Sequence, residues 1–354
     1  MRSRLRFWKY PISIMLLLLM IAAFTVVYSL TEKADAPFEP DNTSDTIVEP
    51  TPDPTENPNV EDPPDEPLDT PGDEPTPEPE EIYNPTEDGF VTIQMEAADI
   101  HRGPLLLVNH NHSFRIPDDI DLVNIVEEKT VNFRVQPENQ RLHRSIIEPL
   151  DEMMEAFLSV MGMRSVAIRS AYRNIGAQQT ILNTYISRMG RREALRWVAL
   201  PGHSEHHTGL AFDFGIWAGG IMNQFDGTGN TSWFRRNSYR YGFIHRYPRD
   251  KEEITKTAHE PWHFRYVGLP HARIMHQNNW ALEEYIELLR EYTFDEPMQQ
   301  EIGDTLYEIY FVKGTDIPIP FYSEFEISGN NIDGFIVTIV RVPYDPDVVV
   351  ESSV

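Results

Sequence analysis

The stretch PGHSEHHTGLAFDFG, residues 201–215, decides how the central part of this chain folds. It begins as a polar turn and ends in the apolar run LAFDFG, which is typical of a buried strand. Gly209 lies between the two parts and lets the backbone reverse without a Cβ clash. The strand is therefore expected to bring Asp213 to the same pocket as His206, although six residues separate the two.

A second stretch, HEPWHFRYVG at residues 259–268, adds Glu260 and His263 three positions apart. The chain has no cysteine, so a metal ion must be held by histidine, aspartate or glutamate. A hydrolytic zinc site needs three protein ligands, an open position for water and a nearby carboxylate that accepts a proton. The residue types therefore predict that His206, Asp213 and His263 hold one zinc ion per catalytic domain, with Glu260 as the base. The sequence alone leaves other divalent metals open.

These residues also resemble a known family. The first stretch fits the pattern SxHxxGxAxD through Ser204, His206, Gly209, Ala211 and Asp213, and the second fits ExWH through Glu260, Trp262 and His263. The phrases LLLVNHNH, SAYRNIGAQQ and YGFIHRYP agree with the same family in the same order. Over about residues 103–270 the chain thus resembles the zinc peptidases that include VanY-type D-alanyl-D-alanine carboxypeptidases, VanX-type dipeptidases and L,D-carboxypeptidases.

The resemblance implies a role for each matching residue. The implied metal ligands are His206, Asp213 and His263, and the implied catalytic residues are Glu260 and Arg173. The implied substrate-binding residues are Arg173, Gln178, Ser204 and Trp262. Ala171 departs from the family, because many relatives have glycine before the corresponding tyrosine and arginine.

Several of these roles have an alternative. Arg173 either stabilises the oxyanion or clamps the free carboxylate of the substrate, since its planar guanidinium suits both. Trp262 either stacks on substrate or is a core aromatic, and Ser204 either lines the site or caps the following turn. Glu260 could instead support a ligand, and Gln178 could lie on a helix surface.

The implied activity is removal of the terminal D-alanine from peptidoglycan stem peptides or precursors by a zinc-dependent D-alanyl-D-alanine carboxypeptidase. Cleavage of tetrapeptide stems by an L,D-carboxypeptidase is an alternative that the metal motif does not separate, and a non-catalytic wall-binding module with the same fold is another. The sequence identifies no protein partner. It has no basic stretch of the kind that neutralises nucleic-acid phosphates, so nucleic-acid binding is not expected.

The N-terminal region predicts attachment to a membrane. Residues 11–30, PISIMLLLLMIAAFTVVYSL, carry no charge and are long enough to cross a bilayer as a helix. The basic tail 1–10 precedes them and acidic residues follow, so we expect the tail in the cytoplasm and the remainder outside the cell. A cleaved signal peptide is the alternative, although the apolar run is long for one and no clear small-x-small site follows it.

Residues 31–88 are rich in proline, glutamate and aspartate. They hold 20 carboxylates against Lys33 alone, which gives a charge of −19 out of the −26 for the whole chain. Such a segment cannot bury a core, so we expect a disordered, self-repelling tether. At about 3 Å per residue when extended, it could hold the following domain more than roughly 100 Å from the membrane.

Globular patterning starts at Gly89 and predicts an α+β fold. Residues 89–295 are expected to form the zinc carboxypeptidase domain, in which a small antiparallel sheet carries the metal site and helices pack against it. Within it, apolar residues recur at helical spacing over residues 146–158, which indicates a core-facing helix. The stretches LYEIYFVKG, FYSEFEIS and GFIVTIVRVP look like strands, so residues 296–354 are expected to form a small β-rich C-terminal appendage. His203 and His207 flank His206 and are expected at the rim of the site, because neighbouring side chains of an extended backbone point to opposite sides.

Overall fold

The computed structural model describes residues 89–321 and 323–341. The predicted basic tail, membrane span and tether, at residues 1–88, lie outside the described residues. Among the helices that the described residues form, none has both the length and the apolar character needed to cross a bilayer. The membrane helix therefore stays a prediction.

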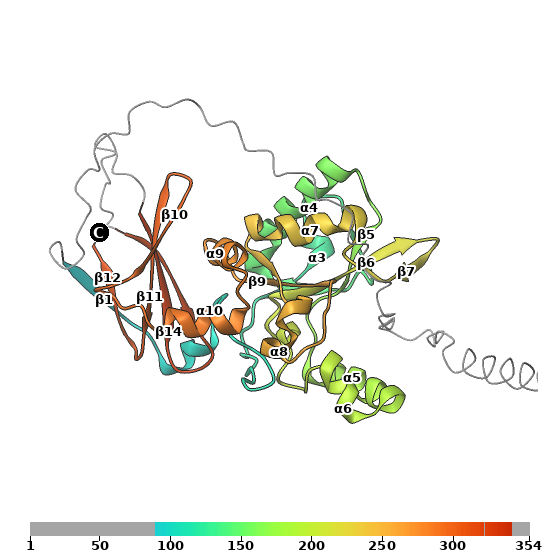
Figure 1. Ribbon diagram of the computed structural model, residues 1–354, viewed down its shortest axis with the longest axis horizontal. Helices are drawn as coiled ribbons and strands as arrows, with labels where there is room; N and C mark the ends of the chain where they lie inside the picture. The colour runs from blue at the N-terminus through green and yellow to red at the C-terminus, as the bar shows by residue number, and fades with distance from the viewer. Residues whose placement is uncertain (1–88, 322, 342–354) are drawn as a thin grey trace, which may run out of the picture. The chain divides into compact units, whose positions relative to one another are not determined.

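The centre of the catalytic part is a six-stranded sheet in the order β3-β5-β6-β9-β8, with β7 paired to β6 (Figure 1). Its strands are β3 (Arg134–Val135), β5 (Val166–Ser170), β6 (Ala211–Ala218), β7 (Ile221–Asn223), β8 (Phe243–His245) and β9 (His263–Tyr266). A separate pair joins β2 (Leu122–Asn124) to β4 (Arg141–His143). The small sheet agrees with the predicted α+β class.

One strand corrects the prediction of an antiparallel sheet. β3 pairs with β5 in parallel, while every other pairing in the six-stranded sheet is antiparallel. The chain between β3 and β5 includes β4 and a long helix, α4 (Ile147–Met161). A connection of that length can return the chain to the same end of the sheet, as parallel pairing requires.

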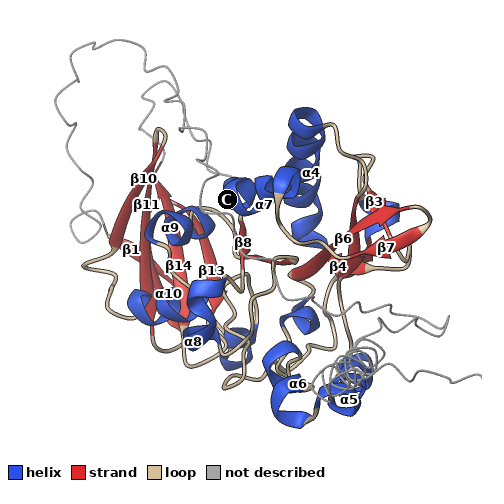
Figure 2. Ribbon diagram, turned by 45° about the vertical axis from the view of Figure 1, so that its right-hand side comes forward, coloured by secondary structure: helices blue, strands red, loops and turns tan. Residues whose placement is uncertain are grey.

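Helices cover both faces of the central sheet. Figures 1 and 2 place α4 and α7 on one side and α5, α6 and α8 on the other. The helices besides α4 are α3 (Ile125–Glu128), α5 (Ile175–Met189), α6 (Arg191–Trp197), α7 (Ser232–Asn237), α8 (Glu252–Thr255), α9 (His271–Asn278) and α10 (Leu282–Leu289). The 3-10 helices are η1 (Ala97–His101), η2 (Arg144–Ile146), η3 (Glu205–Thr208), η4 (Gly229–Thr231), η5 (Ser238–Tyr241) and η6 (Arg249–Lys251).

The main core lies between α4, α7 and one face of the central sheet. The predicted apolar stripe of α4 is confirmed as core, since Leu150, Met153, Met154 and Phe157 are fully buried. Side chains alternate along β6, and Phe212 and Phe214 point into this core. Asp213, which lies between them, therefore faces the opposite side of the sheet. The metal site is expected on that side.

The C-terminal part forms another sheet, which has four strands in the order β10-β11-β14-β13. These strands are β10 (Met298–Ile302), β11 (Thr305–Val312), β13 (Glu324–Gly329) and β14 (Phe335–Arg341). One face packs on α9 and α10, and the other face has its own core around Tyr310, Phe335 and Val337. Burial on both faces explains why β14 reads as a nearly continuous apolar run.

Two strands at this end differ from what the sequence indicates. β1 (Phe90–Gln94) lies within residues 89–295, predicted as the catalytic domain, but pairs with β12 (Asp316–Pro320) of the C-terminal part. β12 contains Pro318 and Pro320, and its pattern does not predict a strand. Among the described strands it pairs with β1 alone, and a proline without an N–H is tolerated on a strand that is unpaired on one side.

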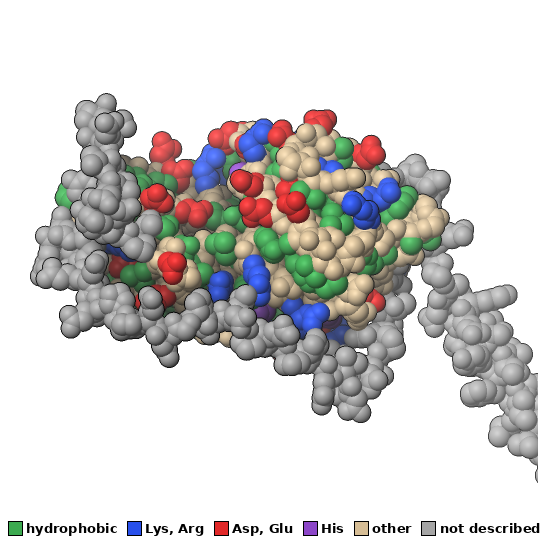
Figure 3. Space-filling model, turned by 90° about the horizontal axis from the view of Figure 1, so that it is seen from above, with side chains coloured by type: hydrophobic (Ala, Val, Ile, Leu, Met, Phe, Trp, Pro, Cys, Tyr) green, Lys and Arg blue, Asp and Glu red, His purple; other side chains and the backbone are tan. Residues whose placement is uncertain are grey.

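Figure 3 shows the surface of the described residues from another side. On the face that it presents, acidic and basic side chains are interspersed with apolar ones.

A buried histidine joins α9 to the C-terminal sheet. His271 is almost completely buried, and its ring contacts the Tyr285 hydroxyl at 2.8 Å and the Thr338 hydroxyl at 3.0 Å. Burial lowers the pKa of His271 to about 3. The folded protein therefore holds this ring neutral, while the unfolded chain protonates it below its ordinary pKa of 6.5.

Replacing His271 by glutamine should weaken the acid dependence of folding stability. Between pH 6.5 and about 3, the unfolded chain binds a proton at His271 that the folded protein does not, so stability falls as pH falls. The contribution approaches about 1.4 kcal/mol per pH unit. Urea unfolding of both proteins between pH 7.5 and 5 measures it. Equal slopes in the wild type and the variant would contradict the assignment.

Candidate metal centre and active site

The central sheet places two of the predicted ligands directly opposite each other. Asp213 of β6 and His263 of β9 are register partners in an antiparallel pair. Opposed residues of such a pair lie on the same face with their Cβ atoms about 5 Å apart. The pairing of β6 with β9 therefore joins residues that are 50 positions apart in the chain.

The third ligand comes from the turn before β6. His206 lies in η3, and the residue that follows this helix, Gly209, has a left-handed φ of 71°. A Cβ at Gly209 would also lie 2.7 Å from the Leu122 side chain and 2.9 Å from the His143 backbone nitrogen. Only glycine fits both the conformation and the space, and the chain can therefore turn from His206 directly into β6.

These three side chains converge. One ligand atom from each of His206, Asp213 and His263 lies within 4.8 Å of the other two, and all three residues are buried. Asp213 Oδ1 lies 3.4 Å from His206 Nε2 and 2.9 Å from His263 Nδ1. Two imidazoles and a carboxylate form a donor set that zinc prefers.

The hydrogen bonds of His206 leave one ring nitrogen suited to a metal ion. Nδ1 donates to the Ala171 carbonyl at 2.6 Å, so Nε2 carries the lone pair when the ring is neutral. Burial lowers the pKa of His206 to about 4, which keeps the ring neutral at pH 7. Nε2 is buried and makes no hydrogen bond with the described residues. A buried nitrogen of this kind fits a metal ligand better than a packing residue.

Glu260 lies next to the three ligands. Its Oε2 is 3.9 Å from His263 Nδ1, and its side chain is 10% exposed. Burial raises the pKa of Glu260 to about 8, with the charges of Asp213 and Glu205 acting in the same direction and those of His263 and Arg173 opposing them. A bound divalent cation would also oppose the shift, because positive charge favours the carboxylate. A buried carboxylate with a raised pKa can both accept and return a proton near neutral pH.

Comparison with known proteins agrees with this geometry. Residues 139–269 match the VanY family, described as D-alanyl-D-alanine carboxypeptidase. A D-alanyl-D-alanine carboxypeptidase of Enterococcus faecium is 34% identical over 246 residues, which cover 68% of this chain and 76% of the relative. The chain belongs to the VanY family. It is therefore a zinc metallopeptidase of the carboxypeptidase type.

Two further relatives connect the VanY family to dipeptidases. A bifunctional D-Ala-D-Ala dipeptidase and carboxypeptidase of Enterococcus gallinarum is 32% identical over 190 residues, which cover 52% of this chain and 94% of the relative. The crystal structure of the vancomycin resistance D,D-dipeptidase VanXYg, in complex with a D-Ala-D-Ala phosphinate analog, matches with a TM-score of 0.64 at 38% identity. That match covers 72% of this chain and 100% of the dipeptidase.

Arg173 lies beside the three predicted metal ligands of this VanY-family chain. Its Nη2 is 3.8 Å from Asp213 Oδ2, and its side chain is 16% exposed. The segment that carries it is fixed to the ligand turn, because the Arg173 backbone N–H donates to the His206 carbonyl at 3.1 Å. Ala171, the departure from the family pattern, is fully buried in the main core. The structure thus places the guanidinium at the edge of the site.

The other predicted substrate residues differ in their surroundings. Gln178 is buried and not on a helix surface: its Nε2 donates to the Ala199 carbonyl at 2.8 Å, and its buried Oε1 has no hydrogen-bond partner among the described residues. Ser204 is buried and is the N-cap residue before η3, but its side chain makes no capping hydrogen bond. Trp262 is partly buried against the main core, which agrees with its alternative role as a core aromatic.

The prediction for His207 was wrong. His207 is fully buried, and its Nδ1 donates to the Arg173 carbonyl at 2.6 Å while its Nε2 accepts from the Gly202 N–H at 3.0 Å. The backbone here is a 3-10 helix and not extended, so neighbouring side chains do not alternate between two sides. His207 holds Arg173 in place from behind the site.

Sequence reasoning missed Glu205 and Tyr247. Glu205 immediately precedes a ligand and is fully buried, with its Oε2 3.2 Å from His263 Nε2. The Tyr247 ring lies 4.9 Å from the His263 ring. The position of a charged residue within the motif was the one sequence feature that pointed to Glu205. The residues that Glu205 contacts come from distant parts of the chain, so its role could not be predicted.

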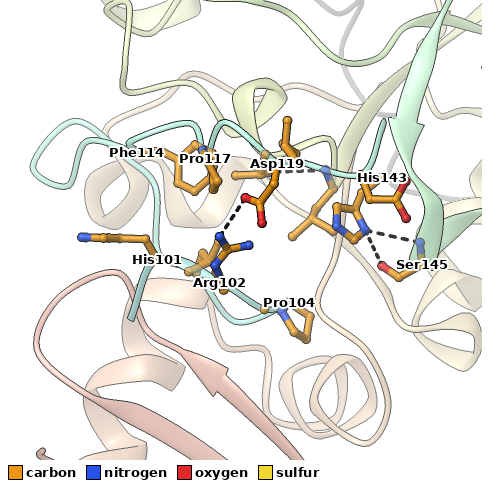
Figure 4. Close-up of a pocket in the computed structure, with 14 residues that line it drawn as sticks. His101, Arg102, Pro104, Phe114, Pro117, Asp119, His143 and Ser145 are labelled. Carbon is orange, nitrogen blue, oxygen red and sulfur yellow. Dashed lines mark hydrogen bonds and ion pairs between the residues drawn. The ribbon is translucent and has the colours of Figure 1, made fainter. Parts of the chain in front are cut away.

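A separate cavity of about 210 Å³ lies behind the ligand turn, where Thr208 and Leu210 form part of its wall (Figure 4). Arg102 reaches Asp119 across it at 2.7 Å, and His143 contacts the Ser145 hydroxyl at 2.9 Å. None of the three metal ligands lines it.

Proposed function

We propose that this protein removes the C-terminal D-alanine from peptidoglycan stem peptides or their precursors. The observation that supports the proposal most strongly is the convergence of His206, Asp213 and His263 with Glu260 at their side. Relatives named for D-Ala-D-Ala cleavage share the family, so a peptide ending in two D-alanines is the expected substrate.

The residues of the chain suit peptide hydrolysis with water as the nucleophile. Zinc, when held by the three ligands, supplies Lewis-acid chemistry that makes water acidic and polarises the peptide carbonyl. The Glu260 carboxylate accepts the proton from the attacking water. Protonated Glu260 then donates that proton to the nitrogen of the departing D-alanine. No covalent bond to the protein forms in this scheme.

Arg173 completes the site as its cationic residue. Its guanidinium lies at the edge of the metal centre, 3.8 Å from Asp213, and is partly exposed. From this position it can donate to the oxygen on which negative charge develops, or to the terminal carboxylate of the substrate. Arg173→Lys would separate the two: loss of carboxylate binding raises KM, whereas loss of oxyanion stabilisation lowers kcat.

The test is release of D-alanine by the full chain in detergent. A pentapeptide stem ending in D-Ala-D-Ala, a tetrapeptide stem ending in one D-alanine and a pentapeptide ending in L-alanine are incubated with the zinc-loaded protein. Mass spectrometry should detect release from the first peptide and not from the third. Release from the tetrapeptide alone would make the protein an L,D-carboxypeptidase, and release from none would contradict the carboxypeptidase proposal.

We further propose that residues 11–30 anchor the protein in the cell membrane, with the catalytic domain outside. The support is the uncharged run of twenty residues, the basic residues before it and the acidic ones after it. The acidic, proline-rich residues 31–88 would then act as a spacer between membrane and wall.

Single cysteines should report this orientation, because the natural chain has none. In intact cells, a membrane-impermeant maleimide should label Ser44→Cys and leave Ser3→Cys unlabelled until the membrane is permeabilised. Labelling of Ser3→Cys in intact cells would contradict the orientation. A mature protein that has lost residues 1–30 would show a cleaved signal peptide in place of an anchor.

A further inference from the structure

We infer that Glu205 positions the zinc ligand His263, and that helix α10, outside the matched family segment, takes part in this positioning through Glu283. The inference rests on the metal site of the proposed function and not on its substrate. Glu205 is fully buried, and none of the steps proposed above requires it.

The two oxygens of Glu205 have different partners. Oε2 faces His263 Nε2 at 3.2 Å. Oε1 accepts from Arg246 Nε at 2.8 Å and from Arg265 Nη1 at 2.9 Å. Two guanidinium groups therefore donate to the same oxygen, in charge-assisted hydrogen bonds of the kind that a carboxylate accepts.

This arrangement selects the tautomer of His263. A carboxylate can only accept, so His263 Nε2 must donate its N–H to Glu205. Nδ1 faces Asp213 Oδ1 at 2.9 Å and Glu260 Oε2 at 3.9 Å. A metal ion held between Nδ1 and Asp213 would take the lone pair of Nδ1, while Nε2 keeps its N–H on Glu205. A carboxylate behind a histidine fixes both the ring orientation and the nitrogen that is offered to a metal.

Glu205 is itself held by buried arginines with further partners. Arg246 donates through both terminal nitrogens to Glu283, at 2.9 and 2.7 Å. Arg265 donates to the carbonyls of Pro104 and Leu106, at 2.9 Å each. Two arginines and two glutamates balance in charge, as buried ions require.

Part of this network comes from outside the segment that matches the family. Glu283 lies on α10, beyond residues 139–269, and it also accepts from Asn109 Nδ2 at 3.1 Å. A chain of direct contacts therefore runs from α10 through Glu283, Arg246 and Glu205 to His263. Residues that never touch zinc thus set the orientation of one of its ligands.

Glu205→Gln is the sharpest test, because it should reverse the tautomer. The amide oxygen would face the two arginine donors at the position of Oε1, which leaves the amide NH₂ facing His263 Nε2. That nitrogen must then accept, and the ring proton moves to Nδ1, where it competes with zinc. We expect zinc affinity, measured on the full chain by competition with a chromogenic chelator, to fall by about 10- to 100-fold. Glu205→Asp keeps the charge and should recover part of it.

Two further variants keep the test decisive. Glu283→Gln leaves Glu205 and both arginines in place and should weaken zinc binding by a few-fold, whereas Glu287→Gln, an exposed residue on the same helix, should not. If Glu205→Gln does not fold, Glu283→Gln decides. Unchanged zinc affinity in the folded variants, with only a lower melting temperature, would overturn the inference. Since zinc affinity is measured without peptide, a wild type that binds zinc but releases no D-alanine would contradict the proposed function alone.

Discussion

Replacing Glu260 by glutamine should lower kcat for D-alanine release by about 10²- to 10⁴-fold while zinc stays bound. Glutamine has nearly the same size but cannot accept the proton of the attacking water or return it to the leaving amine. Because this proton transfer occurs in the transition state, kcat and kcat/KM should fall together, with little change in KM. Steady-state kinetics and the zinc content of the purified protein measure the two quantities.

The matched control for Glu260→Gln is Glu253→Gln on α8, whose side chain is fully exposed. It makes the same chemical change without touching the site and should keep wild-type kcat. A Glu260→Gln protein that retains most of its activity would contradict the assignment of Glu260 as the base. Loss of zinc together with activity would instead indicate that Glu260 supports a ligand.

Replacing His206 by alanine should abolish both zinc binding and peptide hydrolysis. The substitution removes one of three ligands, and the neighbouring His207 is already bonded through both ring nitrogens to the backbone of Arg173 and Gly202. We expect zinc affinity to fall by at least about 100-fold, since even removing a residue behind a ligand costs 10- to 100-fold. Metal analysis after dialysis, and activity with and without added zinc, check the prediction.

Chelation of the wild type provides the comparison for His206→Ala. Removing zinc should stop D-alanine release, and adding it back should restore activity in the wild type but not in the variant. His276→Ala, an exposed histidine on α9, should bind zinc normally. Stoichiometric zinc in His206→Ala would show that the metal is held elsewhere.

Local sequence predicted the fold best where one short stretch contains all the necessary information. The apolar stripe of α4 and the strand β6 follow from periodicity alone, because each buries one face within its own length. β12 escaped prediction because its prolines hide the pattern. β1 was predicted to belong to the catalytic domain but pairs with β12, because pairing is decided by the tertiary fold. His207 was misplaced because the local backbone is helical where an extended one was expected.

In the candidate site, too, local sequence predicted some residues and the tertiary fold decided others. His206, Gly209 and Asp213 lie on one turn and the strand that follows it, so their spacing alone indicates a shared pocket. His263 is distant in the chain, but it belongs to a motif that could be recognised by itself. Glu205 lies in the same stretch but was not predicted as a site residue. Its role depends on its contacts with residues that are distant in the sequence.

The sequence by itself determined the residues that can hold a metal ion, the carboxylate beside them and the family to which they belong. These features depend on side-chain chemistry and short-range spacing, which the order of residues fixes directly. Only the tertiary structure decided which nitrogen of each histidine faces the site and what holds it there. The partners of Glu205 are 41, 58 and 60 positions away, and such distant residues meet only when strands and helices pack together.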